Sequence, residues 1–396
     1  MNNAPDGDLV ARERAAMNPS KILVRGVNWL GDAVMTTPAL LRLREAHRDA
    51  HIAILTDVKL ADLWRNHPAV NSVLSFTKGE SAWSISGRLR REGFHIGLVL
   101  PNSFRSALEL WLAGIPRRLG YARPWRRLFF TDAISTRPGA STMRKRASSE
   151  IHRLIDSKGA RASESAHGSS HQIFDYLHLV GHLGAVASPL SPFLAVTEDD
   201  VKSVHERWQI PRVSTRPLFG LNPGAEYGPA KRWPKERFIA AAVEIQNRTN
   251  CRWLLVGGKS DVPLANEIES QVTSVRSREK LDERSSNDLA ILNLAGATTL
   301  RELCALLKIC RLLLTNDTGP AHVAAAVGTP VIIPFGSTSP ELTGPGMPGD
   351  QGNHFLRSDA ACSPCFLREC PIDFRCMTHI SVKEVVETVL KTSHRD

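Results

Sequence analysis

The sequence lacks long apolar runs, has little tyrosine and almost no Asp-x-Asp pattern. Glycine, proline or charge breaks each apolar stretch of the 396 residues well before the roughly 18 residues that a membrane span needs. The N-terminus carries Asp6, Asp8 and Glu13 without an apolar segment, which argues against a signal peptide. The net charge of +10 would suit nucleic acid, but three Tyr and no interleaved aromatic motif argue against such a partner.

Cysteine is present but does not suggest a disulfide framework. An odd count of seven, in a chain without an export signal, fits a reducing cytoplasm. Four of them gather near the C-terminus as Cys362, Cys365, Cys370 and Cys376. Their spacing does not match the usual paired zinc knuckles. A structural metal or redox-labile pair and four reduced thiols in a folded loop both remain open.

Short apolar runs alternate with helical patterns, which predicts βαβ units and parallel sheets. In the first half we expect strands at 21–25, 51–55 and 96–100, a helix ending near 46, and another helix at 172–183. In the second half we expect strands at 218–221, 253–256, 312–314 and 331–335, with helices at 234–247, 262–271, 300–309 and 321–327. The predicted fold class is α/β, with two Rossmann-like doubly wound domains facing a cleft.

The length of the chain favours two domains of ordinary size. We expect a disordered tail at 1–20, an N-terminal domain at 21–190 and a C-terminal domain at 191–396, with a hinge at 188–192. Residues 137–170 are rich in Ser, Ala and basic residues and have little apolar periodicity. We interpret them as a long loop insertion that adds no core.

The most informative stretch is Asn316-Asp317-Thr318-Gly319-Pro320-Ala321-His322, between an apolar strand and a small-residue helix. A strand that turns directly into a helix presents unpaired N–H groups and a positive dipole end, which favours phosphate. Asp317 is instead suited to accept hydrogen bonds from sugar hydroxyls. The stretch indicates a nucleotide or nucleotide-sugar site, with an ordinary capped turn as the alternative.

Three other loops follow predicted strands. Gly26 to Asp32 holds Asn28 and a carboxylate that is either a helix cap or a general base, Asp32. The loop with Gly224 and Ala225 ends in Lys231, a compact cation suited to a pyrophosphate. Gly257 and Gly258 allow close approach of adenine or ribose.

Basic residues gather in two runs. Residues 117–127 hold five arginines and no acid, and a second run surrounds 144–146. Such patches bind anions or only aid solubility, and charge alone does not decide which.

Taken in order, Gly31-Asp32, the Pro-Gly-Ala to Lys231-Arg232-Trp233-Pro234 stretch, Asn316 to His322 and Phe335-Gly-Ser-Thr-Ser-Pro340 resemble the ADP-heptose:lipopolysaccharide heptosyltransferases over about residues 21–386. The resemblance implies a GT-B fold and inverting, metal-independent transfer from ADP-L-glycero-D-manno-heptose to the lipopolysaccharide inner core, second heptose onto first. It also implies a cytoplasmic protein, a monomer, working at the inner membrane surface.

The resemblance implies roles for individual residues. Asp32 matches the catalytic base. Donor binding falls to residues of the second half, and acceptor binding to residues of the first half, together with Arg123 of the basic run. The expected donor set is Gly224, Ala225, Lys231, Gly257, Gly258, Asp317, Thr318, Gly319 and His322. The expected acceptor set, Asn28, Asn102, Ser103, Arg105 and Arg123, follows from the place of these residues in the loops and the basic run of the first half. For Asn102, Ser103 and Arg105, a simple cap and a solvated helix start remain the alternative. No cofactor and no metal are expected, because the one Asp-x-Asp pair, Asp6 with Asp8, lies in the tail.

Other functions remain open at this stage. A transferase of the same family with a different acceptor, a sugar-nucleotide epimerase with the same two halves and a non-catalytic sugar-binding module all use such loops. An epimerase would convert its nucleotide sugar without any second substrate.

Overall fold

The computed structural model describes residues 21–140, 143–156, 170–278 and 290–394, so the predicted tail at 1–20 lies outside them. Contacts divide the chain into two compact units. The N-terminal unit comprises Met1–Ala140 and Gln172–Leu190, and the C-terminal unit comprises Ser141–His171 and Ser191–Asp396. Each unit contains one six-stranded parallel sheet.

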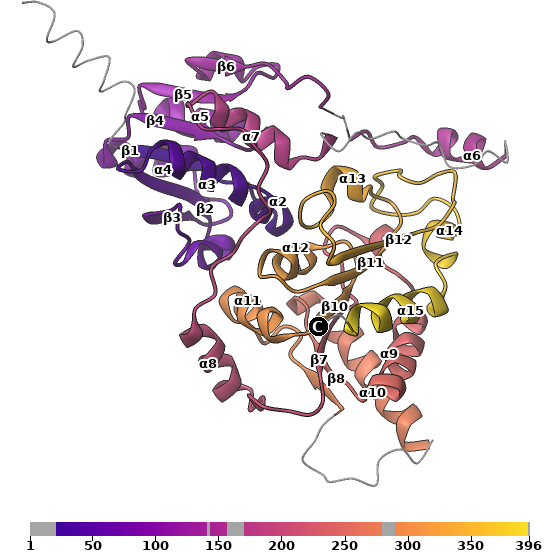
Figure 1. Cartoon of the computed structure of the whole chain (residues 1–396). Helices are drawn as coiled ribbons and strands as arrows, with labels where there is room; N and C mark the ends of the chain where they lie inside the picture. The colour runs from indigo at the N-terminus through magenta and orange to yellow at the C-terminus, as the bar shows by residue number, and fades with distance from the viewer. Residues whose placement is uncertain (1–20, 141–142, 157–169, 279–289, 395–396) are drawn as a thin grey trace, which may run out of the picture. The chain divides into compact units, whose positions relative to one another are not determined.

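The sheet of the N-terminal unit has the order β3-β2-β1-β4-β5-β6 (Figure 1). Its strands are β1 (Lys21–Arg25), β2 (His51–Asp57), β3 (Ser72–Phe76), β4 (Ile96–Val99), β5 (Arg117–Tyr121) and β6 (Asp132–Ile134). Its helices are α2 (Leu30–Met35), α3 (Thr37–Ala46), α4 (Ala82–Glu92), α5 (Phe104–Leu112) and α7 (Ile173–Gly181), with 3-10 turns η1 (Val58–Trp64) and η2 (Arg127–Phe129).

The sheet of the C-terminal unit has the order β12-β11-β10-β7-β8-β9. Its strands are β7 (Leu218–Asn222), β8 (Arg252–Leu255), β9 (Ile291–Asn293), β10 (Leu312–Thr315), β11 (Val331–Phe335) and β12 (Asn353–Arg357). Its helices are α6 (Ser148–Asp156), α8 (Glu198–Arg207), α9 (Lys235–Thr249), α10 (Val262–Arg278), α11 (Leu300–Ile309), α12 (Gly319–Ala326), α13 (Pro340–Thr343), α14 (Arg375–Thr378) and α15 (Val382–Ser393), with 3-10 turns η4 (Pro229–Lys231) and η5 (Lys259–Asp261).

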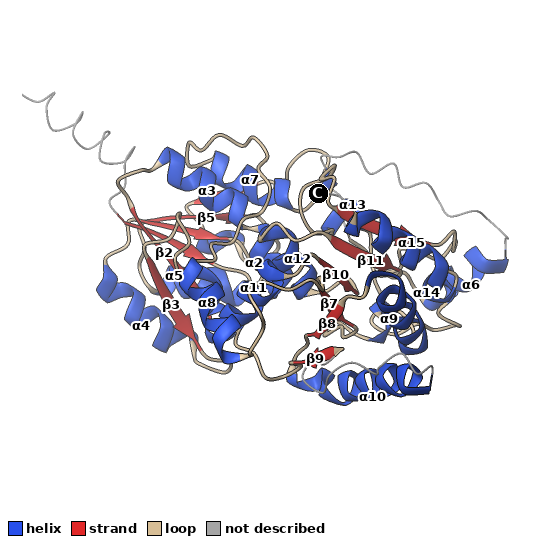
Figure 2. Ribbon diagram, turned by 60° about the horizontal axis from the view of Figure 1, so that its bottom comes forward, coloured by secondary structure: helices blue, strands red, loops and turns tan. Residues whose placement is uncertain are grey.

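Helices cover both faces of each sheet, so the central strands are buried on both sides. In the C-terminal unit, α9 packs between α10 and α15, while α11 packs with α8 and α12 (Figure 2). This double cover explains why β7 and β10 are nearly continuous apolar runs rather than alternating ones. The α/β prediction of two doubly wound halves is confirmed.

In both sheets the order in which successive strands are added reverses at the same place. The first strand of each lies between the second and the fourth, so the switch point falls between β1 and β4 in one unit and between β7 and β10 in the other. Loops at the carboxyl ends of the strands beside a switch point are where doubly wound sheets bind ligands. The loops to compare are therefore those after β1, β4, β7 and β10.

The segment 137–170 differs from its prediction. Part of it is the helix α6, and the buried Ile151, 1% exposed, joins the hydrophobic core of the C-terminal unit. The backbone N–H of Arg146 donates to the Cys365 carbonyl at 3.0 Å. The expectation of a loop without core was wrong here, because the apolar residues at helical spacing, Ile151, Leu154 and Ile155, are few and stand among polar and basic residues. Residues 157–169 lie outside the described chain.

The basic run 117–127 also differs from a solvated loop. Arg117 and Arg118 begin β5, whose later residues are buried, and Arg126 is only 1% exposed. Arg117 reaches Asp132, and Arg118 donates to the Phe129 carbonyl at 2.7 Å. Two of the five arginines in this run, Arg123 and Arg127, are classed as exposed.

Candidate active site

The switch point of the C-terminal unit carries a buried ion pair. Asp317, directly after β10, is 3% exposed, and its Oδ2 atom lies 2.6 Å from the Nζ atom of Lys231 in the loop after β7. Thr338, after β11, donates its hydroxyl to the same oxygen at 2.6 Å. Three loops that are far apart in sequence therefore meet on one carboxylate.

The environment keeps this carboxylate ionised. Burial by itself raises the pKa of Asp317, but the charge and hydrogen bond of Lys231 and the hydroxyl of Thr338 bring the pKa below its ordinary value. From the sequence, Lys231 and Asp317 were expected to bind different parts of a ligand separately. The structure joins them, so a ligand at either residue changes the environment of the other.

Asn316 fixes the loops that carry the pair. Its Oδ1 atom accepts from the backbone N–H of Trp233 at 2.9 Å, and its Nδ2 atom donates to the Pro223 carbonyl at 2.7 Å. Both ends of the loop after β7 are thus tied to the residue before Asp317. This holds Lys231 in place without contributing to the ligand surface, because Asn316 is completely buried.

The helix α12 begins beside the ion pair. Thr318 is its N-cap but makes no side-chain cap bond, and Pro320 occupies the first turn. Gly319 at the first helical position puts no side chain over this end of the helix, while Pro320 has no N–H and the Ala321 N–H donates to the Thr318 carbonyl at 3.0 Å. The alternative of Asp317 or Thr318 as an ordinary side-chain cap is wrong for this helix.

Two buried polar atoms near this helix have no hydrogen-bond partner in the described chain: Nδ1 of His322 and Oγ of Ser337. Burial, followed by the charges of Lys231 and His171, lowers the pKa of His322 to about 4, although Asp317 opposes the shift. His322 is therefore neutral at physiological pH. Buried groups without partners in a native fold commonly face a ligand or water.

The glycines of the donor loops are packed closely. A Cβ atom on Gly224 would lie 2.4 Å from Cγ of Asp261, and one on Gly257 would lie 3.0 Å from Cβ of the same residue. Asp261 accepts from the backbone N–H of Gly258 at 2.9 Å. Gly224, Gly257 and Gly258 therefore share one carboxylate neighbour, while Ala225 is buried beside them.

Sequence reasoning missed several residues of this cluster. Thr338 and Asp261 were not selected, although both follow strands of the sheet, which is the signal that could have found them. Tyr227 was also missed, and its ring lies 4.9 Å from Nζ of Lys231 and 5.1 Å from the guanidinium carbon of Arg368. These contacts hold Lys231 between an aromatic face and Asp317.

In the N-terminal unit, Asp32 lies in the first turn of α2, after β1. It is half-buried, and its charge contributes, after burial, to raising the pKa of the Tyr176 phenol. The Tyr176 hydroxyl accepts from Nε2 of Gln172 at 2.7 Å. Asp32 thus lies beside the polar groups of α7, as well as at the end of β1.

The loop after β1 is supported by a buried charge cluster. Glu109 is fully buried and contacts Nε of Arg25 at 2.8 Å and Nε of Arg105 at 2.9 Å. Arg25 also donates to the Gly26 carbonyl at 2.6 Å and to Oδ1 of Asn28 at 3.3 Å. Asn28 is exposed but has a fixed neighbour.

The remaining acceptor candidates lie after β4. Ser103 caps α5 by accepting from the Ser106 N–H at 3.2 Å, which agrees with the alternative of a helix cap for this residue. The Asn102 Oδ1 atom accepts from Nη1 of Arg126 at 3.3 Å. Arg105 and Asn102 are exposed, as is Arg123, which follows β5. The structure brings Asn28, Asn102, Ser103 and Arg105 to the switch point of this unit.

The four C-terminal cysteines are free thiols. Within the described ranges, no three Cys, His, Asp or Glu side chains are arranged to hold a metal ion. Burial, with the neighbouring thiols, raises the pKa of Cys362 and Cys365 and raises that of Cys376 to about 12. These three thiols are protonated at neutral pH and therefore poorly reactive.

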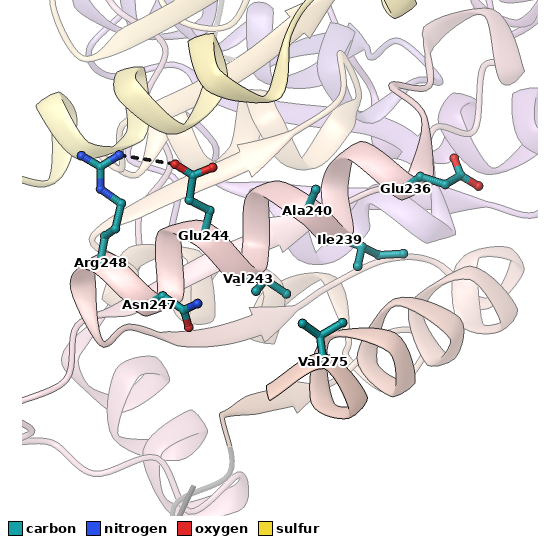
Figure 3. Close-up of a pocket in the computed structure, with 8 residues that line it drawn as sticks. All are labelled: Glu236, Ile239, Ala240, Val243, Glu244, Asn247, Arg248 and Val275. Atoms are coloured by element: carbon teal, nitrogen blue, oxygen red, sulfur yellow. Dashed lines mark hydrogen bonds and ion pairs between the residues drawn. The ribbon is translucent and has the colours of Figure 1, made fainter. Parts of the chain in front are cut away.

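A pocket of about 390 Å³ lies elsewhere, between α9 and α10 (Figure 3). Ile239 and Val243 of α9 and Val275 of α10 line it, and Glu244 pairs with Arg248 at its rim. These residues come from helix surfaces and not from strand ends. It therefore does not belong to the candidate active site.

None of the helices in the described ranges has the length and apolar character of a membrane span.

Known proteins are similar to this chain over most of its length. The model of glycosyltransferase family 9 (heptosyltransferase) matches residues 82–374. Lipopolysaccharide heptosyltransferase 2 of Salmonella typhimurium is 30% identical over 82% of this chain and 85% of its own length.

Two solved structures have the same architecture over nearly the whole chain. ADP-heptose lps heptosyltransferase II of E. coli superposes with a TM-score of 0.69 and 25% identity, covering 94% of this chain and 98% of that one. A glycosyl transferase family 9 protein of Veillonella parvula superposes with a TM-score of 0.71 and 21% identity, covering 95% and 98%, and shows the fold alone.

Proposed function

The chain belongs to glycosyltransferase family 9, the heptosyltransferases, and from this premise we propose that it transfers a heptosyl group from ADP-L-glycero-D-manno-heptose to the lipopolysaccharide inner core. The acceptor is the first heptose of that core. The observation that carries the proposal is the Lys231–Asp317–Thr338 cluster at the switch point of a GT-B C-terminal unit. It combines a cation for a diphosphate with a carboxylate for sugar hydroxyls.

The C-terminal unit binds the donor. Lys231 and the α12 N-terminus at Thr318 and Gly319 face the diphosphate, so the charge on departing ADP is neutralised without a metal cofactor. Asp317 accepts hydrogen bonds from sugar hydroxyls, and neutral His322 donates from its ring. The glycine-rich loops with Gly224, Ala225, Gly257 and Gly258 let adenine and ribose approach the backbone.

The N-terminal unit binds the acceptor and supplies the base. The Asp32 carboxylate takes the proton of the acceptor hydroxyl, whose oxygen attacks the anomeric carbon opposite the nucleotide. The bond from that carbon to the β-phosphate oxygen breaks with its electrons, ADP leaves, and the anomeric configuration inverts. Asn28, Asn102, Ser103, Arg105 and Arg123 hold the anionic core sugars in this scheme.

We further propose that the enzyme acts as a monomer at the cytoplasmic face of the inner membrane. The acceptor is a lipid-linked sugar, so the catalytic groups must reach the bilayer surface. Arg123 and Arg105, both exposed, would meet the negative charge of the core.

The decisive experiment measures ADP release from ADP-heptose with and without a heptosylated core acceptor. We expect release only with acceptor, and Asp32→Asn should lower it by about 10² to 10⁴-fold while ADP affinity stays the same. Asp62→Asn is the matched control, because Asp62 is an exposed carboxylate of the same unit. Near-normal transfer by Asp32→Asn would remove Asp32 from the mechanism, and donor conversion without acceptor would point to an epimerase.

A further inference from the structure

Apolar and cationic side chains gather on one exposed surface of the N-terminal unit. Trp125 is 83% exposed and Leu128 81%, while Phe104 is 51% and Trp111 47% exposed. Phe104 and Trp111 of α5 both pack edge-on against Phe129, with ring centroids 5.1 and 5.6 Å apart. Phe129 adjoins Leu128, so α5 and the loop after β5 form one surface. We call it the Trp125 surface: Phe104, Trp111, Trp125, Arg127 and Leu128.

A buried arginine, Arg126, anchors the loop that carries the exposed Trp125, Arg127 and Leu128 side chains. Arg126 is 1% exposed, donates to the Pro101 carbonyl at 2.9 Å and lies over the Phe130 ring. Burial, then the charge of Arg123, lowers the pKa of Arg126 to about 10. Trp125 has a φ of +65°, a backbone region that bulky residues rarely adopt. A strained, anchored loop with a fully presented tryptophan is typical of a binding element.

The charge of the surface has one sign. Residues 117–129 contain no acid, and Arg123 and Arg127 are exposed. Their backbone carbonyls accept hydrogen bonds within the loop, but neither guanidinium makes a hydrogen bond or ion pair with another residue that the structure describes. The nearest carboxylate in sequence, Asp132, is engaged by Arg117 and by the Thr131 hydroxyl. The surface therefore favours a negatively charged partner.

We propose that the Trp125 surface docks the protein on a bilayer of anionic phospholipid. Tryptophan is favoured at the level of lipid headgroups, leucine and phenylalanine enter the acyl boundary, and arginine is attracted by the negative surface potential. A stable dimer needs about 800 Å² and roughly 20 to 30 residues on each partner, which exceeds five side chains. The inference rests on the proposed location at the inner membrane and deepens it by naming the docking surface and its lipid, while docking itself requires neither donor nor acceptor.

Co-sedimentation of the full chain with vesicles tests this docking. Phosphatidylcholine vesicles with and without phosphatidylglycerol contain no lipopolysaccharide, so binding to them reports on phospholipid alone. The test variant is Trp125→Ser/Arg127→Ser/Leu128→Ser. The control is Arg212→Ser/Val213→Ser, which removes an exposed cation and an apolar side chain that is 93% exposed from the C-terminal unit.

The parent and the control should bind vesicles that contain phosphatidylglycerol, with an affinity that falls at high salt. The affinity of the triple variant for the same vesicles should be at least about tenfold lower. Equal binding by parent and triple variant, or none by the parent, would overturn the proposal. So would a dimer of the parent, seen by sedimentation, that the triple variant abolishes.

Two further readouts separate folding and catalysis from docking. Thermal melting should be the same for parent and triple variant, because the three side chains are exposed. Transfer to a water-soluble core oligosaccharide should also be unchanged. Loss of docking with intact transfer would therefore leave the proposed function standing, whereas loss of transfer with intact docking would count against that function only.

Discussion

Replacing Lys231 with alanine removes the cation from the buried Asp317 carboxylate, at a pair distance of 2.6 Å. Breaking a buried ion pair on one side costs about 3–5 kcal/mol, because the remaining charge is left without compensation. The Thr338 hydroxyl still donates to Asp317 in the variant. We therefore expect the lower end, about 3 kcal/mol less free energy of unfolding at neutral pH.

The pH dependence of this loss has a definite sign. In the parent, burial alone would raise the pKa of Asp317, but Lys231 and Thr338 lower it overall. The pair then stabilises the fold above the unfolded carboxyl pKa of about 4, and this stabilisation is lost as pH falls through the folded value. Without Lys231, burial is expected to raise the pKa of this carboxyl, so the variant should gain stability as pH falls toward the unfolded value of about 4.

The assay is urea unfolding of parent and variant across this pH range, with calorimetry of ADP binding at neutral pH. Lys235→Ala is the matched control, because Lys235 pairs with Glu267 at the same 2.6 Å but both side chains are 40% exposed. The control should lose far less stability, and its loss should shrink in salt. Equal losses in the two variants, or no difference in pH slope, would refute the electrostatic reasoning, and unaltered ADP affinity in Lys231→Ala would refute the diphosphate site.

Three further outcomes follow from the same contacts. Gly224→Ala should weaken ADP binding about tenfold with little change in acceptor KM, measured by calorimetry and kinetics, because the new Cβ would lie 2.4 Å from Cγ of Asp261. Arg126→Ser should lower the free energy of unfolding by about 1–3 kcal/mol, and with it the melting temperature, because Arg126 is buried. Arg127→Ser, at an exposed position, should leave the melting temperature unchanged. Calorimetric melts of the two variants that coincide would contradict this difference. Transfer should continue in excess chelator, and a loss of rate restored by added Mg²⁺ or Mn²⁺ would count against metal-independent transfer.

Sequence alone placed the strands that build the two switch points. Lys21–Arg25, Leu218–Asn222 and Leu312–Thr315 are nearly continuous apolar runs, which is the signature of strands covered on both faces. β5 was missed because it begins with two arginines, Arg117 and Arg118. Their side chains bond to Asp132 and to the Phe129 carbonyl while the backbone pairs with β4. A pattern of apolar residues cannot reveal an arginine whose side chain donates its hydrogen bonds to backbone carbonyls.

The candidate site was partly predictable for a similar reason. Loops that follow strands were found, and the residues in them, Asp32, Lys231 and Asp317, occupy the switch points. The pairing of Lys231 with Asp317 spans 86 residues of sequence, and the burial of Glu109 in the middle of a helix depends on Arg25 of another element. Such contacts depend on three-dimensional packing, so no local pattern could have identified them.

The two units share one strand order but support different chemistry at their switch points. In the C-terminal unit the candidate ligand-binding groups themselves, Lys231 and Asp317, are paired, and their loops are fixed by Asn316 and Thr338, which would suit the diphosphate of the proposed donor. In the N-terminal unit, Asp32 is half-buried, and the loops after β1 and β4 expose Asn28 and Asn102. In the proposed mechanism Asp32 takes a proton from a lipid-linked acceptor, and its half-buried position would leave the access that this role needs.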